Sequence, residues 1–387
     1  MRTKFTINRW AAAAVMALGL AAPAQAAEPL KIGSILSVTG PAAFLGEDMK
    51  AGMEIALDEI NEAGGIGGRP VEWVFYDAES QTAKGITATR RLISQDEVDI
   101  LVGGGNMSGI ALAMVPLTES AGLPFISTEG SMKIVNPVEE RRWTFKSTVD
   151  DDQVIHRLAD YFEKQGITKV ALLSDTSGFG QSAVEQMEKV GPERGLDVVY
   201  EAFNPADTDM TGQLTRIKSS GAQAIICWTV TPAGVVFLKQ AQQLGMDDLT
   251  LVHSYGFVSQ RYMELAGDAA SKLLLVSVKF PVGDQLPADD PTREQILSLQ
   301  QKFQEKFGRA PSQFAAQTYD AIHLAAKALE AGGDDAEAVR AAIPAVQGWG
   351  GVGGTFTFSE KRHSGLSKED LVLVNWKDGR FHLADYK

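Results

Sequence analysis

Two short glycine-containing loops carry residue types that bind a small anion. Residues 103–108 read Gly-Gly-Gly-Asn-Met-Ser, and residues 128–131 read Thr-Glu-Gly-Ser. Glycine lets a ligand approach the backbone, and hydroxyls with free N–H groups at a helix start attract a negative group. The two loops together predict a site that holds both oxygens of a carboxylate. In the competing interpretation, Ser108 and Ser131 serve only as helix caps.

A third loop, residues 176–180, allows a different interpretation. Residues 178–183 match the pattern G-x-G-x-x-A, and Glu201 lies near the end of the next predicted strand. This is the outline of a dinucleotide-binding fingerprint, which would make the chain an enzyme. The fingerprint requires a tight turn directly after the strand, whereas residues 174–177 separate the strand from the first glycine. The dinucleotide-dependent enzyme is therefore the weaker alternative.

The other reactive side chains form no catalytic or metal-binding pattern. The sequence contains no G-x-S-x-G, G-x-x-x-x-G-K-[ST] or H-E-x-x-H motif. The single cysteine, Cys227, lies in an apolar run and cannot form an internal disulfide. The acidic run 150–152 is typical of a helix start. The histidines, which show no ligand spacing, are His156, His253, His323, His363 and His382. We expect a non-enzyme with no catalytic residues, no metal and no cofactor.

Strands that alternate with amphipathic helices must position these loops. In the first part of the chain, strands are predicted at residues 31–38, 71–76, 100–102 and 124–127, and helices at 49–60, 82–94 and 108–121. The pattern restarts near residue 150, with strands at 170–173, 198–203, 224–228 and 249–252 and helices at 152–165, 181–190, 211–219 and 232–244. This alternation predicts an α/β fold with two doubly wound parallel-sheet lobes.

The rest of the chain is too irregular for a third lobe. A strand is predicted at 273–280, helices at 293–307, 311–331 and 336–343, and further strands at 356–358, 371–376 and 380–383. These pieces must cover both lobes, so we expect the chain to cross between them more than twice and to form a hinge of several strands. Ligands of open parallel sheets bind beyond the carboxyl ends of the strands, where all three glycine loops lie.

The N-terminus predicts export. Arg2, Lys4 and Arg9 precede an apolar stretch at 11–22, and Ala24-Gln25-Ala26 is a small-x-small cleavage signature. Residues 1–26 are thus expected to be a signal peptide, cleaved near Ala26. The mature chain carries 33 basic and 49 acidic residues, a formal charge of −16. Such a charge disfavours nucleic acid and anionic membrane surfaces as partners, and we expect a monomer with no direct membrane insertion.

Short sequence motifs along the whole mature length indicate a resemblance to a known protein family. The chain resembles the type I periplasmic binding proteins of branched-chain amino acid ABC transporters, the leucine/isoleucine/valine-binding group. The markers are Ile32-Gly33, Thr39-Gly40-Pro41, Gly46, residues 51–65 (AGMEIALDEINEAGG), residues 67–70 (GGRP), Tyr76-Asp77, Val102-Gly103, Pro116, residues 124–127, residues 178–180, residues 237–245 (FLKQAQQLG) and residues 318–321 (TYDA).

The resemblance implies two lobes joined by three hinge strands. The N-terminal lobe would comprise residues 27–148 and 278–372, and the C-terminal lobe residues 149–277 and 373–387. The ligand carboxylate would bind to Ser108, Ser131 and backbone groups of Asn106, Met107, Glu129 and Gly130. Phe179 would close over the ligand from the second lobe, while Phe44 and Leu45 would shape the side-chain pocket of the first.

The chain departs from this family where an amino-acid ligand would need a countercharge. Amino-acid binders carry an acid in the loop after the strand at 249–252, and our alignment places Tyr255 there. Trp228 adds a further ring at the end of another strand, beside Thr229. Because an unpaired buried ammonium is costly, we expect an aromatic or hydrophobic carboxylate without an ammonium. Glu129 is an alternative source of the acid, which leaves hydrophobic amino acids open.

The implied function is solute capture in the periplasm by hinge closure. The closed protein would present its ligand to the membrane permease and ATPase of an ABC transporter. A ligand-binding sensory module of the same fold is the alternative from a different class of function.

Overall fold

The first part of the chain builds a five-stranded parallel sheet in the computed structural model, which describes residues 28–384. The sheet order is β2-β1-β3-β4-β5. The strands are β1 (Leu30–Leu36), β2 (Val71–Asp77), β3 (Ile100–Val102), β4 (Phe125–Ser127) and β5 (Thr144–Lys146). The predicted signal peptide lies outside the described residues.

Helices cover both faces of this sheet because its strands are apolar on both sides. Ile100 and Val102 belong to the same core as α1 (Ala43–Glu62) and α10 (Gln313–Gly332). Leu101 and Phe125 pack in a separate core with α2 (Thr82–Arg91) and α3 (Ser108–Ala121). Two further helices, α9 (Arg293–Phe307) and α11 (Ala336–Ala342), complete this side of the molecule. We call the sheet and these helices the first lobe.

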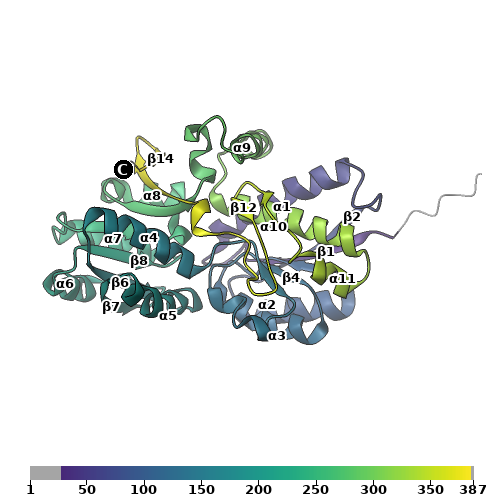
Figure 1. The fold of residues 1–387 in the computed structure, drawn as a ribbon, viewed down its shortest axis with the longest axis horizontal. Coiled ribbons are helices and arrows are strands. Elements are labelled where there is room, and N and C mark those ends of the chain that lie inside the picture. Colours follow the sequence, from purple (N-terminus) through teal and green to yellow (C-terminus); the bar gives the residue numbers. More distant parts are fainter. Residues whose placement is uncertain (1–27, 385–387) are drawn as a thin grey trace, which may run out of the picture.

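The second lobe is built on a seven-stranded mixed sheet with the order β14-β13-β10-β9-β8-β6-β7. Its parallel strands are β6 (Lys169–Asp175), β7 (Asp197–Phe203), β8 (Ala224–Trp228), β9 (Thr250–His253) and β10 (Leu274–Val278). The hairpin β13 (Leu371–Lys377) and β14 (Arg380–Leu383) adds to β10 in antiparallel fashion. In Figure 1 this lobe lies on the left and the first lobe on the right.

The helices of the second lobe again divide between two cores. One core joins α4 (Asp151–Gln165) and α5 (Gly178–Glu193) to strand residues such as Leu172 and Ile226. The other joins α6 (Thr211–Ser220), α7 (Ala233–Gln243) and α8 (Gln260–Ala266) to strand residues such as Ile225 and Cys227. Successive strand residues therefore face opposite helix layers, and the predicted buried packing of Cys227 is confirmed.

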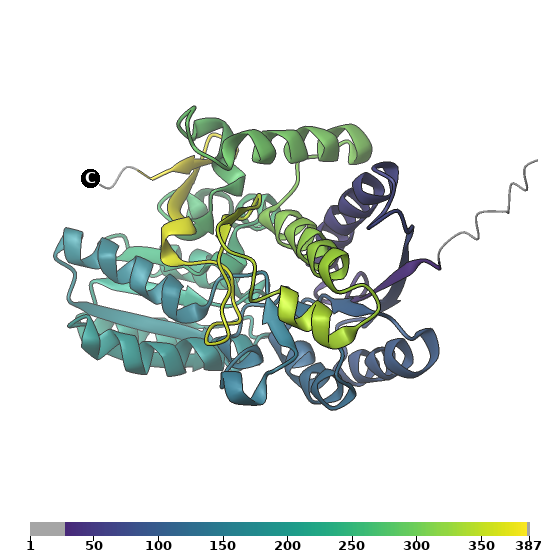
Figure 2. The same ribbon diagram turned by 45° about the vertical axis from the view of Figure 1, so that its right-hand side comes forward.

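The chain passes between the lobes three times, after β5, after β10 and before β13. The turned view of Figure 2 shows the last two passages beside each other near the middle of the molecule. Residue 372, the expected end of the first lobe, falls inside β13, where Leu371 already pairs with Val278 of β10. We therefore propose that the second lobe resumes at Leu371.

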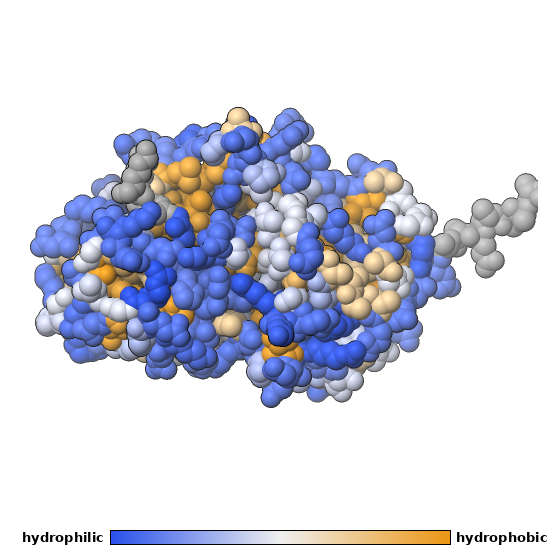
Figure 3. Space-filling model, in the orientation of Figure 1, coloured by the Kyte–Doolittle hydropathy of each residue, from blue (hydrophilic) through white to orange (hydrophobic). Residues whose placement is uncertain are grey.

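The predicted fold class, two parallel-sheet α/β lobes, is confirmed. Among the described strands and α-helices, three were not predicted: the three-residue strand β5, the helix α8, and the strand β11 (Trp349–Gly350) that pairs with β12 (Thr355–Phe356). Among residues 28–384, no helix has both the length and the apolar character needed to cross a membrane. The face shown in Figure 3 is mostly hydrophilic with small apolar patches.

Candidate functional site

The loop after β3 is bent so that its amides point toward a carboxylate of the same lobe. Gly103, Gly105 and Asn106 have φ values of 91°, 74° and 67°. The backbone N–H groups of Gly104 and Asn106 donate to Glu129 Oε1 at 2.9 and 3.1 Å. A side chain at residue 104 would not fit, because its Cβ would lie 2.1 Å from Glu129 Oε2.

Glu129 is therefore a buried support of the loop. It also accepts from Ser127 Oγ at 2.6 Å and from the backbone and hydroxyl of Thr128, both at 3.0 Å. Burial raises the pKa of Glu129, while these donors favour its charged form. The Glu129 carboxylate is thus hydrogen-bonded within its own lobe, and so is the backbone N–H of Asn106. This placement does not favour the expectation that either group faces a ligand.

Ser108 and Ser131, in contrast, lie together as predicted. The backbone N–H of Ser131 donates to Ser108 Oγ at 3.1 Å. Ser131 Oγ accepts from the backbone N–H of Lys133 at 3.3 Å and so caps a short turn. Ser108 does not cap α3, because the N-cap residue is Met107. Each hydroxyl accepts one backbone proton, which leaves its own proton for a ligand oxygen.

Three aromatic rings of the second lobe pack together and form a wall. The ring of Phe179 lies 5.6 Å from those of both Trp228 and Tyr255, which are 6.3 Å apart. All three side chains are buried. Trp228 Nε1 has no hydrogen-bond partner, although a buried indole N–H usually finds one. The wall therefore offers a ligand one free donor and three apolar surfaces.

The aromatic wall touches the first lobe at Gly130. A Cβ at this position would lie 2.2 Å from Tyr255 Oη and 2.5 Å from Phe179 Cε2. Gln313 of α10 donates to the backbone carbonyl of Tyr255, which is a second tie between the lobes. The structure thus brings Phe179, Tyr255 and Gly130 into one cluster.

Local sequence explains why Phe179 projects there. Ser177 caps α5 by accepting from the N–H groups of Phe179 and Gly180 at 3.2 and 3.5 Å. Gly178 and Gly180 accordingly lie in the first turn of the helix, and Gly180 packs directly on the carbonyl of Asp175. The first glycine of a dinucleotide fingerprint forms the tight turn between strand and helix, whereas Gly178 is already the first residue of α5, so this arrangement does not favour the dinucleotide alternative.

An acid of the run 150–152, which was predicted to begin a helix, lies at the same place. Asp151 Oδ2 accepts from the backbone N–H of Met132 at 3.2 Å and from Ser182 Oγ. Its Oδ1 lies 3.5 Å from Tyr255 Oη. Burial raises the pKa of Asp151 to about 7, against the opposing charge of Lys146. Asp151 therefore sits between the lobes as a carboxyl that is readily protonated.

Lys146 accompanies this acid as a fully buried cation. Its Nζ donates to the backbone carbonyl of Gly130 at 2.6 Å and pairs with Asp150 Oδ1 at 2.8 Å. Lys146 was not predicted as a site residue, because the short strand β5 that carries it was not predicted. The position of Asp151 at a strand-to-helix junction was the available signal, but any helix start favours acids.

The other predicted site residues lie farther from this cluster or serve their own lobe. Thr229 is buried, and its hydroxyl donates to Asp175 Oδ2 at 2.6 Å. Leu45 is part of the first-lobe core. Phe44 instead crosses toward α8, where its ring lies 4.9 Å from that of Tyr262. Their roles toward a ligand remain predictions.

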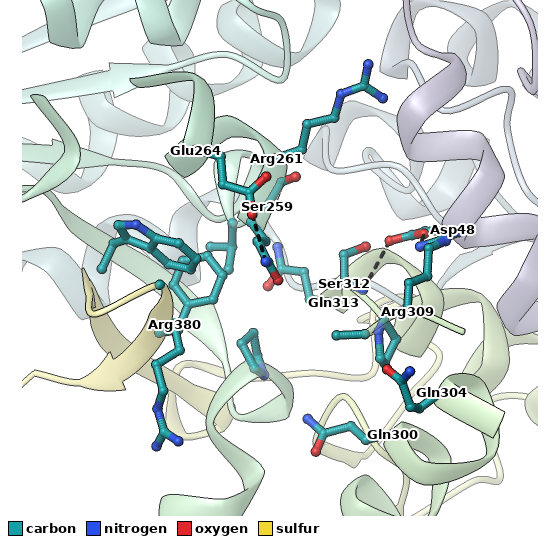
Figure 4. A pocket seen from close by; sticks show the side chains of 18 of the residues that line it. Asp48, Ser259, Arg261, Glu264, Gln300, Gln304, Arg309, Ser312, Gln313 and Arg380 are labelled. Carbon is teal, nitrogen blue, oxygen red and sulfur yellow. Dashed lines mark hydrogen bonds and ion pairs between the residues drawn. The ribbon is translucent and has the colours of Figure 1, made fainter. Parts of the chain in front are cut away.

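A polar groove of about 930 Å³ lies on the Phe44 side of the junction between the lobes. Figure 4 shows Asp48 beside Ser312 and Arg309 on one side, with Glu264 and Arg380 across from them. Arg309 pairs with Asp48, and Arg380 pairs with Asp284 at 3.1 Å. Arg261 also lines the groove; no ion pair is found for it among the described residues, and its guanidinium lies 6.0 Å from the centre of the Phe44 ring. The groove therefore offers one unpaired cation, apart from the serine cluster. Within residues 28–384, no group of His, Cys, Asp and Glu side chains could hold a metal ion.

Comparisons with known proteins agree with this architecture. The sequence profile of a family described as "Periplasmic binding protein" matches residues 29–380. "Leu/Ile/Val-binding protein homolog 7" of Brucella melitensis is 27% identical over 376 residues, which cover 93% of this chain and 92% of the relative.

Solved structures show the same similarity. An extracellular ligand-binding receptor of Rhodopseudomonas palustris superposes with a TM-score of 0.84 at 22% identity, covering 92% of this chain and 99% of the other. A branched-chain amino acid transporter substrate-binding protein of Streptococcus pneumoniae, in complex with isoleucine, gives a TM-score of 0.77 at 25% identity, covering 92% and 98%.

Proposed function

Because this chain belongs to the periplasmic binding protein family, we propose that it is the substrate-binding protein of an ABC transporter and captures a small hydrophobic carboxylate between its lobes. Its place of action would be the periplasm, and its partners a permease and an ATPase. One relative is named a homolog of Leu/Ile/Val-binding protein, and another was solved with isoleucine, so hydrophobic carboxylates are the first ligands to test.

The observation that carries this proposal is that the aromatic wall meets the first lobe at Gly130, the residue before Ser131. Ser108 and Ser131 supply hydroxyl protons, and Trp228 Nε1 supplies an unpaired donor. The apolar rings exclude water, which strengthens hydrogen bonds to a carboxylate. Closure would bring these donors and rings together around the ligand, so the ligand would favour the closed form by its differential affinity.

The specificity of the site depends on whether the protein binds an amino group of the ligand. Glu129 is engaged by its own lobe, and Tyr255 is neutral, which leaves Asp151 as the acid beside the aromatic wall. Asp151, whose pKa burial raises to about 7, is the nearest acid to Tyr255 Oη. We propose that the ligand is a hydrophobic acid whose amino group is not required for binding.

Calorimetric titration with two molecules of the same carbon skeleton tests the proposal. Leucine carries the ammonium, and 4-methylpentanoate lacks it; benzoate adds an aromatic comparison. We expect 4-methylpentanoate to bind at least as tightly as leucine. Leucine binding more than tenfold tighter would show that the ammonium is recognised. Absence of binding by all three would contradict the proposed carboxylate function.

A further inference from the structure

An apolar cavity of about 420 Å³ lies between the lobes, next to the serine and aromatic cluster. Its walls come from both lobes: Pro41 and Met107 from the first, and Pro205, Val230, Pro232 and Val236 from the second. Volumes of this size are typical of small-molecule sites. The cavity is separate from the polar groove of Figure 4.

Two residues join this cavity to the candidate carboxylate site. Met107 lines the cavity and directly precedes Ser108 at the start of α3. Val230 lines it from the other side, and its Cγ1 would lie 2.7 Å from a Cβ at Gly256. Phe179 Cε1 would lie 3.1 Å from the same point. The cavity therefore begins where the aromatic wall and the glycine loop end.

The residues that line the cavity disfavour a second charged group on the ligand. Among the described residues that line the cavity, Asp207 is the charged one, and no lysine or arginine accompanies it. A ligand group placed there would be apolar, because a buried anion without a cation is costly. A second carboxylate would in addition face Asp207.

We propose that this cavity receives the distal apolar part of the ligand, so that the protein selects elongated monocarboxylates. The inference rests on the proposed function and extends it from a small acid to one with a long apolar tail. Because both lobes contribute walls, the tail would contact all of them only in the closed form. Burial of the tail would therefore favour closure.

A series of straight-chain acids tests the role of the cavity by calorimetry. We expect affinity to rise by about fourfold for each methylene added from butanoate to octanoate, the factor for burial of one CH₂ group. Octanedioate, which has the same length and a second carboxylate, is expected to bind at least about tenfold more weakly than octanoate, because Asp207 and the apolar walls disfavour its distal charge. A flat affinity along the series, or equal binding of the two C8 acids, would overturn the inference.

A substitution that fills the cavity gives the matching protein test. Ala206 lines the cavity from an exposed loop, so Ala206→Trp should occupy the space without disturbing either core. We expect octanoate affinity to fall at least about tenfold while leucine or butanoate affinity stays unchanged. Ala202→Trp is the control, since Ala202 is also exposed in the second lobe but does not line the cavity.

The outcomes separate this inference from the function on which it rests. Binding of short acids with no loss of octanoate affinity in Ala206→Trp overturns the cavity's role alone. If no carboxylate of any length binds, the proposed function fails and the inference fails with it.

Discussion

Gly130 is the residue at which the aromatic wall of the second lobe meets the first lobe. Gly130 has no side chain. Tyr255 Oη and Phe179 Cε2 can therefore lie only 2.2 and 2.5 Å from the position that a Cβ of residue 130 would occupy. These atoms belong to the second lobe, whereas the fold of the first lobe does not depend on them. In the proposed closure, Gly130 would therefore matter more than it does in folding.

Gly130→Ala is expected to weaken ligand binding by about tenfold or more, because overpacking at a fitted contact typically costs about 1–3 kcal/mol. The melting temperature should change little. Gly109→Ala is the control, since a Cβ there meets nothing within 4 Å. Calorimetric titration of both variants with the tightest of the acids above measures the effect. Equal affinities in the two variants would contradict the closed contact.

The raised pKa of Asp151 predicts a pH-dependent stability. Its ordinary pKa is 3.8 and its folded pKa is about 7. Since the folded value lies above the unfolded one, the stabilising contribution of the protonated carboxyl is full below pH 3.8 and is lost as pH rises through 7. Asp151→Asn stays neutral, and its amide can still accept from Met132 and Ser182.

Asp151→Asn should therefore gain stability relative to the unchanged protein as pH rises. We expect the difference in unfolding free energy to grow by about 1–3 kcal/mol between pH 5 and pH 8, measured by urea denaturation. Other titrating groups cancel in the comparison. Asp152→Asn, at the neighbouring position, serves as the control. A difference that does not change with pH would contradict the assigned burial of the charge.

The residues of the site could be predicted only in part. Ser108, Ser131 and Phe179 follow strand ends, and strand ends of a parallel sheet meet at one edge. The placement of Glu129 depended on where the amides of Gly104 and Asn106 point, which is set by positive φ values and by packing. No local pattern in the sequence carries that information.

At the scale of elements, the packing of α1 on α10 depends on a close approach at Gly52. A Cβ there would lie 2.2 Å from the carbonyl oxygen of Ala315 and 2.7 Å from Thr318 Oγ1. The same hydroxyl donates to the carbonyl of Met49 at 2.7 Å. The two helices are thus held by a contact between backbones that any larger residue would separate.

Alanine substitutions at two helical glycines should change the unfolding free energy in opposite directions. Gly52→Ala is expected to lower the unfolding free energy by about 1–3 kcal/mol, because the neighbouring backbone must move. Gly212→Ala, in the exposed first turn of α6, should raise it by up to about 1 kcal/mol through helix propensity. Urea denaturation measures both. A neutral Gly52→Ala would show that the helices can separate without cost.

The long elements were predictable because their signals are local. Apolar spacing set α3 and α9 at their observed bounds. The strand β5 escaped because three residues, Thr144–Lys146, are too few to show alternation. The pairing of β13 with β10 is also nonlocal, joining positions nearly a hundred residues apart, and spacing along the chain does not specify such partners.

At the scale of the whole molecule, a few hydrogen bonds join the lobes beside the hinge. The backbone N–H of Met132 in the first lobe donates to Ser182 Oγ in the second at 3.1 Å. Ser182 Oγ in turn donates to Asp151. In the proposed closure this hydroxyl would stabilise the closed form, so it would report on the balance between open and closed states.

Ser182→Ala should shift the ligand-free protein toward an open form. One hydrogen bond contributes about 0.5–1.5 kcal/mol net, which corresponds to a change of roughly two- to twelvefold in the balance between the states. Small-angle X-ray scattering should show a larger radius of gyration for the variant without ligand and the same value as the unchanged protein at saturating ligand. Ser219→Ala is the control, because that hydroxyl donates within α6 to the carbonyl of Thr215 at 3.0 Å. Since closure and binding are linked, Ser182→Ala should also lower affinity, by no more than this factor. Identical scattering of both variants, with or without ligand, would mean that the lobes do not move relative to each other.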